Sequence, residues 1–199
     1  MFVTDRLTAR LWTGSDAERA YDLYSRWEVV RWLGATPRAL ESPAEVPALI
    51  DRMRARSADP RYGAWALERR DTGLVVGTVL LAPLPGGDGE VEVGWHLHPD
   101  SWGNGYATEA ARGALARGFA DGLTEVHAVL RPGNEPSAAV CRRLGMTHRG
   151  RTDRWYGLEL ESFLAVPDTA GPNTAGPSTA VHDTAGPDTR GRDTAGPRR

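Results

Sequence analysis

The chain has 199 residues, of which 40% are hydrophobic and seven are tryptophans, and its formal net charge is -2. This length suits one folded domain, and the charge gives no electrostatic reason to expect a nucleic-acid partner. A single cysteine excludes an intramolecular disulfide framework, no apolar run reaches the roughly 20 residues of a membrane span, and the first residues lack a signal-peptide core. We therefore expect a cytoplasmic protein with no membrane partner.

The first half of the chain alternates strand and helix patterns. Residues 6–12 alternate like a strand, and residues 15–33 open with a cap signal and continue with helical spacing. Residues 42–57 predict a second helix. Residues 62–84 predict two strands joined by a hairpin turn at residues 71–73.

The second half predicts a strand–helix–strand crossover followed by a helix and strand pattern. Residues 89–98 alternate like a strand, residues 107–121 place small and apolar side chains on one helical face, and residues 125–130 form the next strand. Residues 135–145 predict a short helix that ends at a glycine, and residues 151–166 supply the last strand or strands. The fold class is therefore α+β, with a central mixed, mostly antiparallel sheet flanked by helices.

The composition changes at residue 168. Residues 168–199 repeat TAGP four times and contain one valine as their only large aliphatic residue. Such a segment buries too little apolar surface to offset its ordering entropy. We therefore expect residues 1–167 to form the domain and residues 168–199 to be a disordered tail.

A glycine-flanked turn precedes the predicted helix over residues 107–121. Gly103 and Gly105 permit backbone conformations that other residues avoid, and they let main-chain N–H groups approach a ligand. The helix that follows directs its unpaired N–H groups and its positive dipole end into the same turn. This arrangement predicts a site for a phosphate or pyrophosphate, although a tight strand-to-helix connection explains the glycines equally well.

Four stretches together resemble the GNAT superfamily of acetyl-CoA-dependent N-acetyltransferases, in the branch similar to the ribosomal-protein alanine acetyltransferases. In the family's order they are TDRLTARLW, EVGWHLHPDSWGNGYATEA, PGNEPSAAVCRRLGM and WYGLELESF. The resemblance implies a single GNAT-like domain over residues 1–167. It also implies acetyl-CoA as cosubstrate and an amine as acceptor.

The resemblance also assigns roles in cofactor binding. The pyrophosphate is expected on the backbone amides of Gly103, Asn104, Gly105, Tyr106, Ala107 and Thr108. Leu97 resembles the position whose main chain pairs with pantetheine and whose N–H faces the thioester carbonyl. Asn134 resembles an asparagine that reaches the pantetheine arm, and it equally suits a helix N-cap. Trp102 departs from the family pattern, which usually has Gln or Arg there.

Acetyl transfer to an amine needs a proton acceptor, because an alkyl ammonium group has a pKa of about 10.4. Glu92 is the candidate base, and the alternative is a solvated strand glutamate like Glu90. The departing thiolate needs a proton. The resemblance points to Ser137 as the donor, or to Cys141, where many relatives have a tyrosine. Ser137 could instead stabilise the first helical turn, and Cys141 could be a small buried hydrophobe.

The acceptor side is the least defined part of the sequence. The candidate substrate residues are Arg31, Trp32, Trp155 and Tyr156, although core packing explains the aromatic ones equally well. His96 and His98 are separated by one residue, but no third ligand recurs at a suitable spacing, so we expect no metal.

The sequence leaves three further questions open, namely the acceptor, catalysis against binding alone, and the oligomeric state. The sequence favours direct attack in a ternary complex on a protein N-terminus or a small-molecule amine, because nothing in it resembles an activated nucleophile. The alternative is a catalytically silent acyl-CoA sensor or interaction module. The sequence does not distinguish a monomer from a homodimer.

Overall fold

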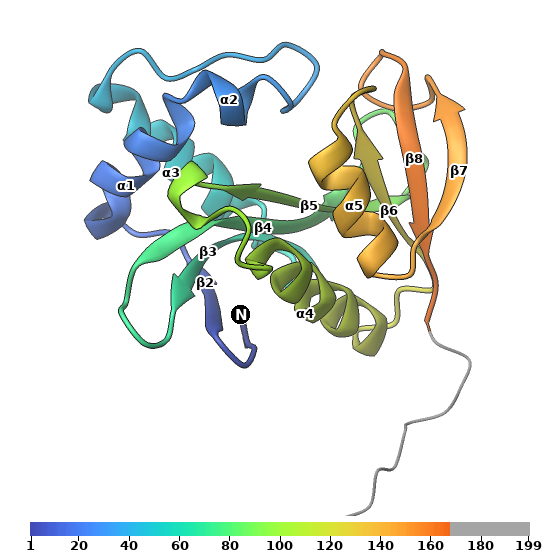
Figure 1. Cartoon of the computed structure of the whole chain (residues 1–199), viewed down its shortest axis with the longest axis horizontal. Coiled ribbons are helices and arrows are strands. Elements are labelled where there is room, and N and C mark those ends of the chain that lie inside the picture. The colour runs from blue at the N-terminus through green and yellow to red at the C-terminus, as the bar shows by residue number, and fades with distance from the viewer. Residues whose placement is uncertain (168–199) are drawn as a thin grey trace, which may run out of the picture. The chain divides into compact units, whose positions relative to one another are not determined.

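A computed structural model describes residues 1–167, which carry one eight-stranded sheet and its helices (Figure 1). The predicted tail over residues 168–199 lies outside the described residues. The strands are β1 (Phe2–Val3), β2 (Leu7–Leu11), β3 (Gly63–Arg69), β4 (Val75–Pro83), β5 (Val91–Leu97), β6 (Val126–Leu130), β7 (Thr147–Thr152) and β8 (Leu160–Ala165). The helices are α1 (Ala17–Tyr24), α2 (Trp27–Val30), α3 (Val46–Ala55), α4 (Tyr106–Ala120) and α5 (Glu135–Arg143), with 3-10 turns η1 (Gly14–Asp16), η2 (Pro43–Glu45) and η3 (Pro99–Ser101).

The sheet is mixed and mostly antiparallel. Its strand order is β1-β2-β3-β4-β5-β6-β8-β7, and β5 and β6 form its one parallel pair among the described strands. Helix α4 provides the crossover between these two strands, as a parallel connection requires. This arrangement confirms the predicted α+β class. None of the helices between residues 1 and 167 combines the length and apolar character needed to span a membrane.

Helices cover both faces of the sheet, because the strands alternate their apolar side chains between two cores. On β4, Val79 and Leu81 belong to the core under α4, whereas Leu80 and Ala82 belong to the core shared with α1, α2 and α3. Helix α5 packs beside α4 and β6 (Figure 1). The two faces therefore carry separate sets of helices.

The helix predicted over residues 15–33 is divided into α1 and α2, which is a difference from the sequence pattern. Arg26 has an extended backbone, with φ -85° and ψ 117°, and it separates the two helices. Tyr24 and Val30 are both buried in one core. In a continuous helix they would lie about 120° apart around the axis, since each residue turns the helix by about 100°. The break lets both side chains reach the same core.

The C-terminal strands also differ from the pattern in one respect. The last strands were expected within residues 151–166, but β7 begins at Thr147. Strand β7 lies at the edge of the sheet and is largely exposed, so its sequence has no apolar alternation that would mark its start. The hairpin turn at residues 71–73 is confirmed between β3 and β4.

Strands β5 and β6 pair over only a short length. Their one paired position is Glu92 with His127, although β5 continues to Leu97. Beyond Glu92 the two strands therefore separate, and Figure 1 shows β5 and β6 running in clearly different directions. This separation opens the sheet at the point where the candidate site lies.

Candidate active site

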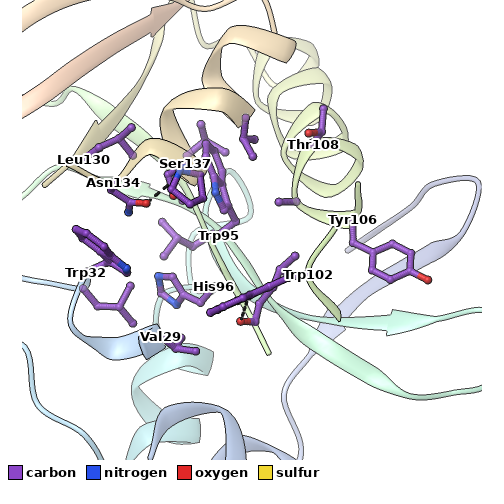
Figure 2. Close-up of a pocket in the computed structure, with 18 of the residues that line it drawn as sticks. Val29, Trp32, Trp95, His96, Trp102, Tyr106, Thr108, Leu130, Asn134 and Ser137 are labelled. Atoms are coloured by element: carbon purple, nitrogen blue, oxygen red, sulfur yellow. Dashed lines mark hydrogen bonds between the residues drawn. The ribbon is translucent and has the colours of Figure 1, made fainter. Parts of the chain in front are cut away.

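The opening between β5 and β6 is occupied by a cleft of about 1110 Å³. One wall is β5 from Glu92 to Leu97, and the opposite wall is the end of β6 with the start of α5 (Figure 2). The cleft extends from the glycine turn before α4 to the helices on the other face of the sheet. Its volume reaches the upper end of ordinary ligand pockets, so it has room for a long ligand and a second substrate.

The cleft-facing edge of β5 presents free backbone groups. The N–H of His98 donates to the carbonyl of Val76 at 2.9 Å, and in an antiparallel pair this directs alternate backbone groups toward β4. The backbone groups of Trp95 and Leu97 therefore face the cleft. The indole Nε1 of Trp102 donates to the Leu97 carbonyl at 2.9 Å, which leaves the Leu97 N–H as a donor.

The glycine turn exposes the N-terminus of α4 to the cleft. Gly103 and Gly105 both have φ of 77°, and Gly105 is the helix N-cap without a side-chain capping bond. The first N–H groups of a helix have no acceptor within the helix itself. Asn104 fixes the turn instead, because its Nδ2 donates to the carbonyls of Ser101 and Trp102 at 3.2 and 3.0 Å. The turn is thus a rigid loop with N–H donors available for an anion.

The residues predicted to hold the pyrophosphate differ in whether they line the cleft. Gly103, Gly105, Tyr106, Ala107 and Thr108 line the cleft, whereas Asn104 does not. The ring of Tyr106 points away from the cleft (Figure 2) and lies under the guanidinium of Arg6, 4.8 Å from it.

Positive charge surrounds the same turn. Arg112 and Arg143 line the cleft there, and Arg143 donates to the Thr108 hydroxyl at 3.3 Å. This end of the cleft therefore suits an anionic ligand on grounds of charge as well as of backbone geometry.

Asn134 and Ser137 face the cleft from the start of α5. The Oδ1 of Asn134 accepts the backbone N–H of Ser137 at 3.3 Å, which is the N-cap bond of the helix (Figure 2). Both residues line the cleft. Cys141 is fully buried in the core and is not part of the lining, and burial raises the pKa of its thiol to about 12. Geometry therefore favours the Ser137 hydroxyl over the thiol as a group that meets a ligand.

Glu92 lies at the deep end of the cleft, where β5 and β6 still pair. Its side chain is only 7% exposed, and its Oε1 accepts a hydrogen bond from the Tyr156 hydroxyl. Burial raises the pKa of Glu92, although the Tyr156 hydrogen bond and the charge of Arg56 oppose the shift. Tyr156 comes from the turn between β7 and β8, where its φ is 61°. Two elements distant in sequence thus meet at one carboxylate.

His96 is a functional candidate that the sequence interpretation did not assign to catalysis. It lines the cleft on the same side of β5 as Glu92, and its Nδ1 lies 3.2 Å from the hydroxyl of Tyr24. Burial, aided by the charge of Arg56, lowers the pKa of His96 to about 4, so the ring is neutral at pH 7. The sequence carried one signal for this candidate, because His96 lies four residues after Glu92 on a strand and therefore faces the same side.

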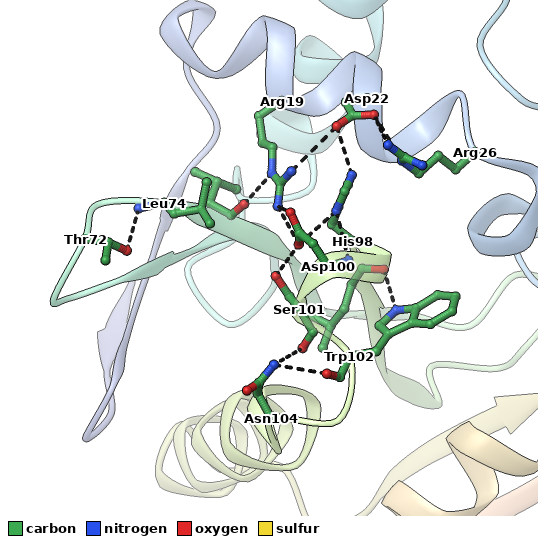
Figure 3. A network of polar contacts seen from close by, with 12 residues as sticks. Arg19, Asp22, Arg26, Thr72, Leu74, His98, Asp100, Ser101, Trp102 and Asn104 are labelled. Atoms are coloured by element: carbon green, nitrogen blue, oxygen red, sulfur yellow. Dashed lines mark hydrogen bonds and ion pairs between the residues drawn. The ribbon is translucent and has the colours of Figure 1, made fainter.

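His98 has a different environment, although it follows His96 by two residues. Its ring is buried between Asp22, 2.9 Å away, and Asp100 (Figure 3). Within residues 1–167, no group of three or more His, Cys, Asp or Glu side chains is arranged to hold a metal.

The four predicted substrate residues divide between two locations. Arg31 and Trp32 line the cleft after α2, with the guanidinium stacked 4.5 Å from the indole, and Tyr156 lines it beside Glu92. Trp155 does not line the cleft. It is buried, and its ring packs against His127 with centroids 4.8 Å apart. The two adjacent side chains face opposite ways at this turn, so Tyr156 reaches the cleft and Trp155 enters the core.

Comparison with known proteins gives a consistent result. Residues 6–147 match the model of the Acetyltransferase (GNAT) domain family. The uncharacterized N-acetyltransferase YoaA of Bacillus subtilis is 32% identical over 148 residues, which cover 74% of this chain and 82% of that protein.

Solved structures agree in fold. An acetyltransferase from Agrobacterium tumefaciens superposes with a TM-score of 0.68 at 25% identity, covering 82% of this chain and 92% of that one. RimJ of Mycobacterium smegmatis, solved in complex with CoA-disulfide, superposes with a TM-score of 0.70 at 19% identity, covering 84% and 88%. At the latter identity the likeness concerns the fold alone.

Proposed function

This chain belongs to the GNAT acetyltransferase family and is an N-acetyltransferase that uses acetyl-CoA, and from that premise we propose that it acetylates a primary amine by direct attack within a ternary complex. The acceptor is a protein N-terminus or a small-molecule amine. The observation that carries the proposal is a single cleft that joins an uncapped helix N-terminus to a buried carboxylate.

The residues at the glycine turn fit the pyrophosphate of acetyl-CoA. The N–H groups at the start of α4 have no side-chain cap, and a side-chain atom placed at Gly103 would meet nothing within 4 Å, so the turn is open to a ligand. The backbone amides from Gly103 to Thr108 would hold the pyrophosphate. Leu97 and Asn134 would hold the pantetheine arm, and Arg112 and Arg143 would balance the negative charge of the CoA phosphates.

The edge of β5 is suited to polarise a carbonyl. When bound, acetyl-CoA supplies a thioester whose carbonyl oxygen gains negative charge as the amine attacks. The Leu97 N–H is the proposed donor to that oxygen, and the Trp95 N–H is a second donor on the same edge. Removal of one such donor typically slows an acyl transfer by about 100- to 1000-fold.

Two side chains complete the proton transfers. Glu92 accepts the proton of the attacking amine, while Tyr156 holds one of its carboxyl oxygens. The raised pKa of Glu92 makes it a better proton acceptor than an exposed glutamate. The neutral His96 ring accepts a hydrogen bond from the incoming amine. As the C–N bond forms and the C–S bond breaks, the Ser137 hydroxyl donates its proton to the thiolate and regains one from solvent, while Glu92 releases to solvent the proton that it took from the amine.

A covalent acetyl-enzyme is not part of the proposal. Cys141 is buried outside the cleft lining and its pKa is raised, so it lacks both the access and the thiolate character that a nucleophile needs. Direct attack therefore requires both substrates to be bound together.

The test is the acceptor-dependent release of free thiol from acetyl-CoA. The panel contains N-terminal peptides, aminoglycosides, polyamines and amino acids, with mass spectrometry of the acceptor to establish one acetyl group per thiol released. We expect one acceptor class to support release, with intersecting double-reciprocal lines. Intact CoA binding without release for any amine would contradict the proposal and favour an acyl-CoA sensor.

A further inference from the structure

The acceptor half of the cleft, which we define as the part lined by α2, the end of α3, Glu92 and His96, contains three arginines. They are Arg31, Arg56 and Arg131. We infer that the acceptor is a primary amine that carries a carboxylate close to the amine. This inference rests on the function proposed above, because it describes the second substrate of the same site.

Arg56 lies at the C-cap of α3, where it is exposed and lines the cleft. The ion pairs among residues 1–167 include none with Arg56. Arg52 and Arg54, in the last turn of the same helix, also form none. Arginines at this position are favoured by the negative end of the helix dipole. Arg56 differs from them because it lines the same cleft as Glu92 and His96, whereas Arg52 and Arg54 do not line it. It is thus a cation in the part of the cleft where the acceptor would react.

Arg31 is held in the acceptor half, and within residues 1–167 it forms no ion pair. Its guanidinium stacks 4.5 Å from the ring of Trp32, and both side chains line the cleft. A cation–π contact fixes the plane of a guanidinium but leaves its charge and its edge N–H groups available. Those edge groups match the two oxygens of a carboxylate.

Arg131 connects the two walls of the cleft. It follows β6, and its Nη2 donates to the carbonyls of Gly34 and Ala35 after α2, each at 2.8 Å. These partners are neutral, so the charge of Arg131 is retained.

Negative charge in the acceptor half is weaker. Glu92, which must be ionised to act as the base, and Glu28 are the two carboxylates of the acceptor half, against the three arginines. Glu28 is exposed and lies 3.8 Å from Arg26. The acceptor half is therefore net positive. It repels a polyamine or aminoglycoside and attracts an acceptor with its own anion.

The experiment compares acceptors that differ in charge near the amine. The pairs are β-alanine with β-alaninamide, and a peptide that begins Ala-Asp with one that begins Ala-Asn, and 1,4-diaminobutane serves as the cationic acceptor. The value of kcat/KM for thiol release is expressed per unprotonated amine, because the members of a pair differ in amine pKa. We expect the anionic member of one pair to be preferred by at least about tenfold, and less at high salt. The pair that responds distinguishes a free amino acid from an acidic peptide.

Variants connect the preference to the arginines. Arg56→Gln and Arg31→Gln should each reduce the preference several-fold, whereas Arg56→Lys should retain most of it. Arg149→Gln is the matched control, because Arg149 is exposed on β7 and does not line the cleft. Thermal unfolding of each variant checks that the fold is intact.

The outcomes separate this inference from the proposed function. Equal rates within both pairs, or a preference for 1,4-diaminobutane, would overturn the inference and leave the acetyltransferase function standing. A preference that survives in the Arg31→Gln/Arg56→Gln double variant would overturn its assignment to these arginines. Intact CoA binding with no release for any amine would overturn the function and the inference together.

Discussion

The two halves of the cleft are built from different groups. The half that suits CoA consists mainly of backbone N–H groups at the end of β5 and the start of α4, with Asn104 and Trp102 fixing the turn between them. The acceptor half consists of side chains, with Glu92 and Tyr156 meeting from distant elements. A site made of backbone tolerates most side-chain changes, whereas a site made of side chains depends on each one. The two halves should therefore respond differently to substitution.

The largest expected effect is in the side-chain half. Glu92→Gln removes the proposed proton acceptor and keeps the size of the side chain, so kcat should fall by about 100-fold or more. The KM for acetyl-CoA should change little, because Glu92 is not in the CoA half. Steady-state kinetics over a range of pH measures both values, and the acidic limb of the wild-type profile should lie above the ordinary pKa of glutamate, since burial raises that of Glu92.

Glu90→Gln is the matched control for this variant. Glu90 lies two residues earlier, pairs with Arg154 and does not line the cleft. Its replacement should leave kcat near the wild-type value. An equal loss of rate in both variants would show that acidic charge near β5, rather than the position of Glu92, matters.

CoA binding by the half of the cleft made of backbone groups should weaken mainly when a substitution changes the backbone conformation. Gly105→Val places a β-branched residue at φ 77°, where strain of about 1–2 kcal/mol per residue is expected. The turn should open, and the Kd for CoA measured by calorimetry should rise by about tenfold. Gly73→Val imposes the same strain in the β3–β4 hairpin, at φ 73°. That control should lower thermal stability without weakening CoA binding.

Ser137 is the side chain in the CoA half that the proposed chemistry requires. Ser137→Ala should lower kcat by about tenfold, because it removes the proposed proton donor. The fold should be kept, because the helix cap uses the Ser137 backbone N–H. Cys141→Ala should leave kcat unchanged and cost about 1–2 kcal/mol of stability, since the thiol is in the core. Stopped-flow measurement of thiol release separates the two. A slow Cys141→Ala enzyme with a normal Ser137→Ala enzyme would reverse the assignment.

Much of the fold could be predicted because its strands and helices carry clear periodicity. The crossover through α4 and the β3–β4 hairpin are of this kind. The break at Arg26 could not be predicted, because it depends on Tyr24 and Val30 sharing a core with residues distant in sequence. The start of β7 was missed because an exposed edge strand lacks an apolar pattern.

Parts of the site, like parts of the fold, could be predicted only where the signal is local in the sequence. The glycine turn is one continuous motif, so its position in the cleft could be predicted from the sequence. The contact between Glu92 and Tyr156 spans 64 residues and depends on how a turn folds. Trp155 and Tyr156 were equivalent in sequence, yet only one of them reaches the cleft. The roles proposed for these residues remain predictions.

One polar network joins α1 to the segment before α4, and it lies outside the cleft chemistry (Figure 3). Arg19 of α1 donates to both carboxyl oxygens of Asp100 at 2.9 Å, and His98 lies between Asp100 and Asp22. Asp100 lies three residues before Gly103. Although burial opposes the shift, hydrogen bonds from Ser101, Arg19 and His98 lower the pKa of Asp100 to about 2.

The smallest expected effect follows from this network and has a definite pH dependence. Because the folded-state pKa of Asp100 lies below its unfolded value of about 3.9, the ionised carboxylate stabilises the fold above that pH, and this contribution is lost as the pH falls toward 2. Asp100→Asn should therefore cost about 1 kcal/mol at pH 7, a modest value because the side chain is 47% exposed and screened by solvent. Urea unfolding at pH 7, 4 and 3 should show the difference from wild type shrinking. Asp71→Asn, in an exposed pair with Arg69, should show a smaller effect at pH 7. A difference for Asp100→Asn that stays constant with pH would mean that packing, and not the charge of Asp100, sets the stability of this segment.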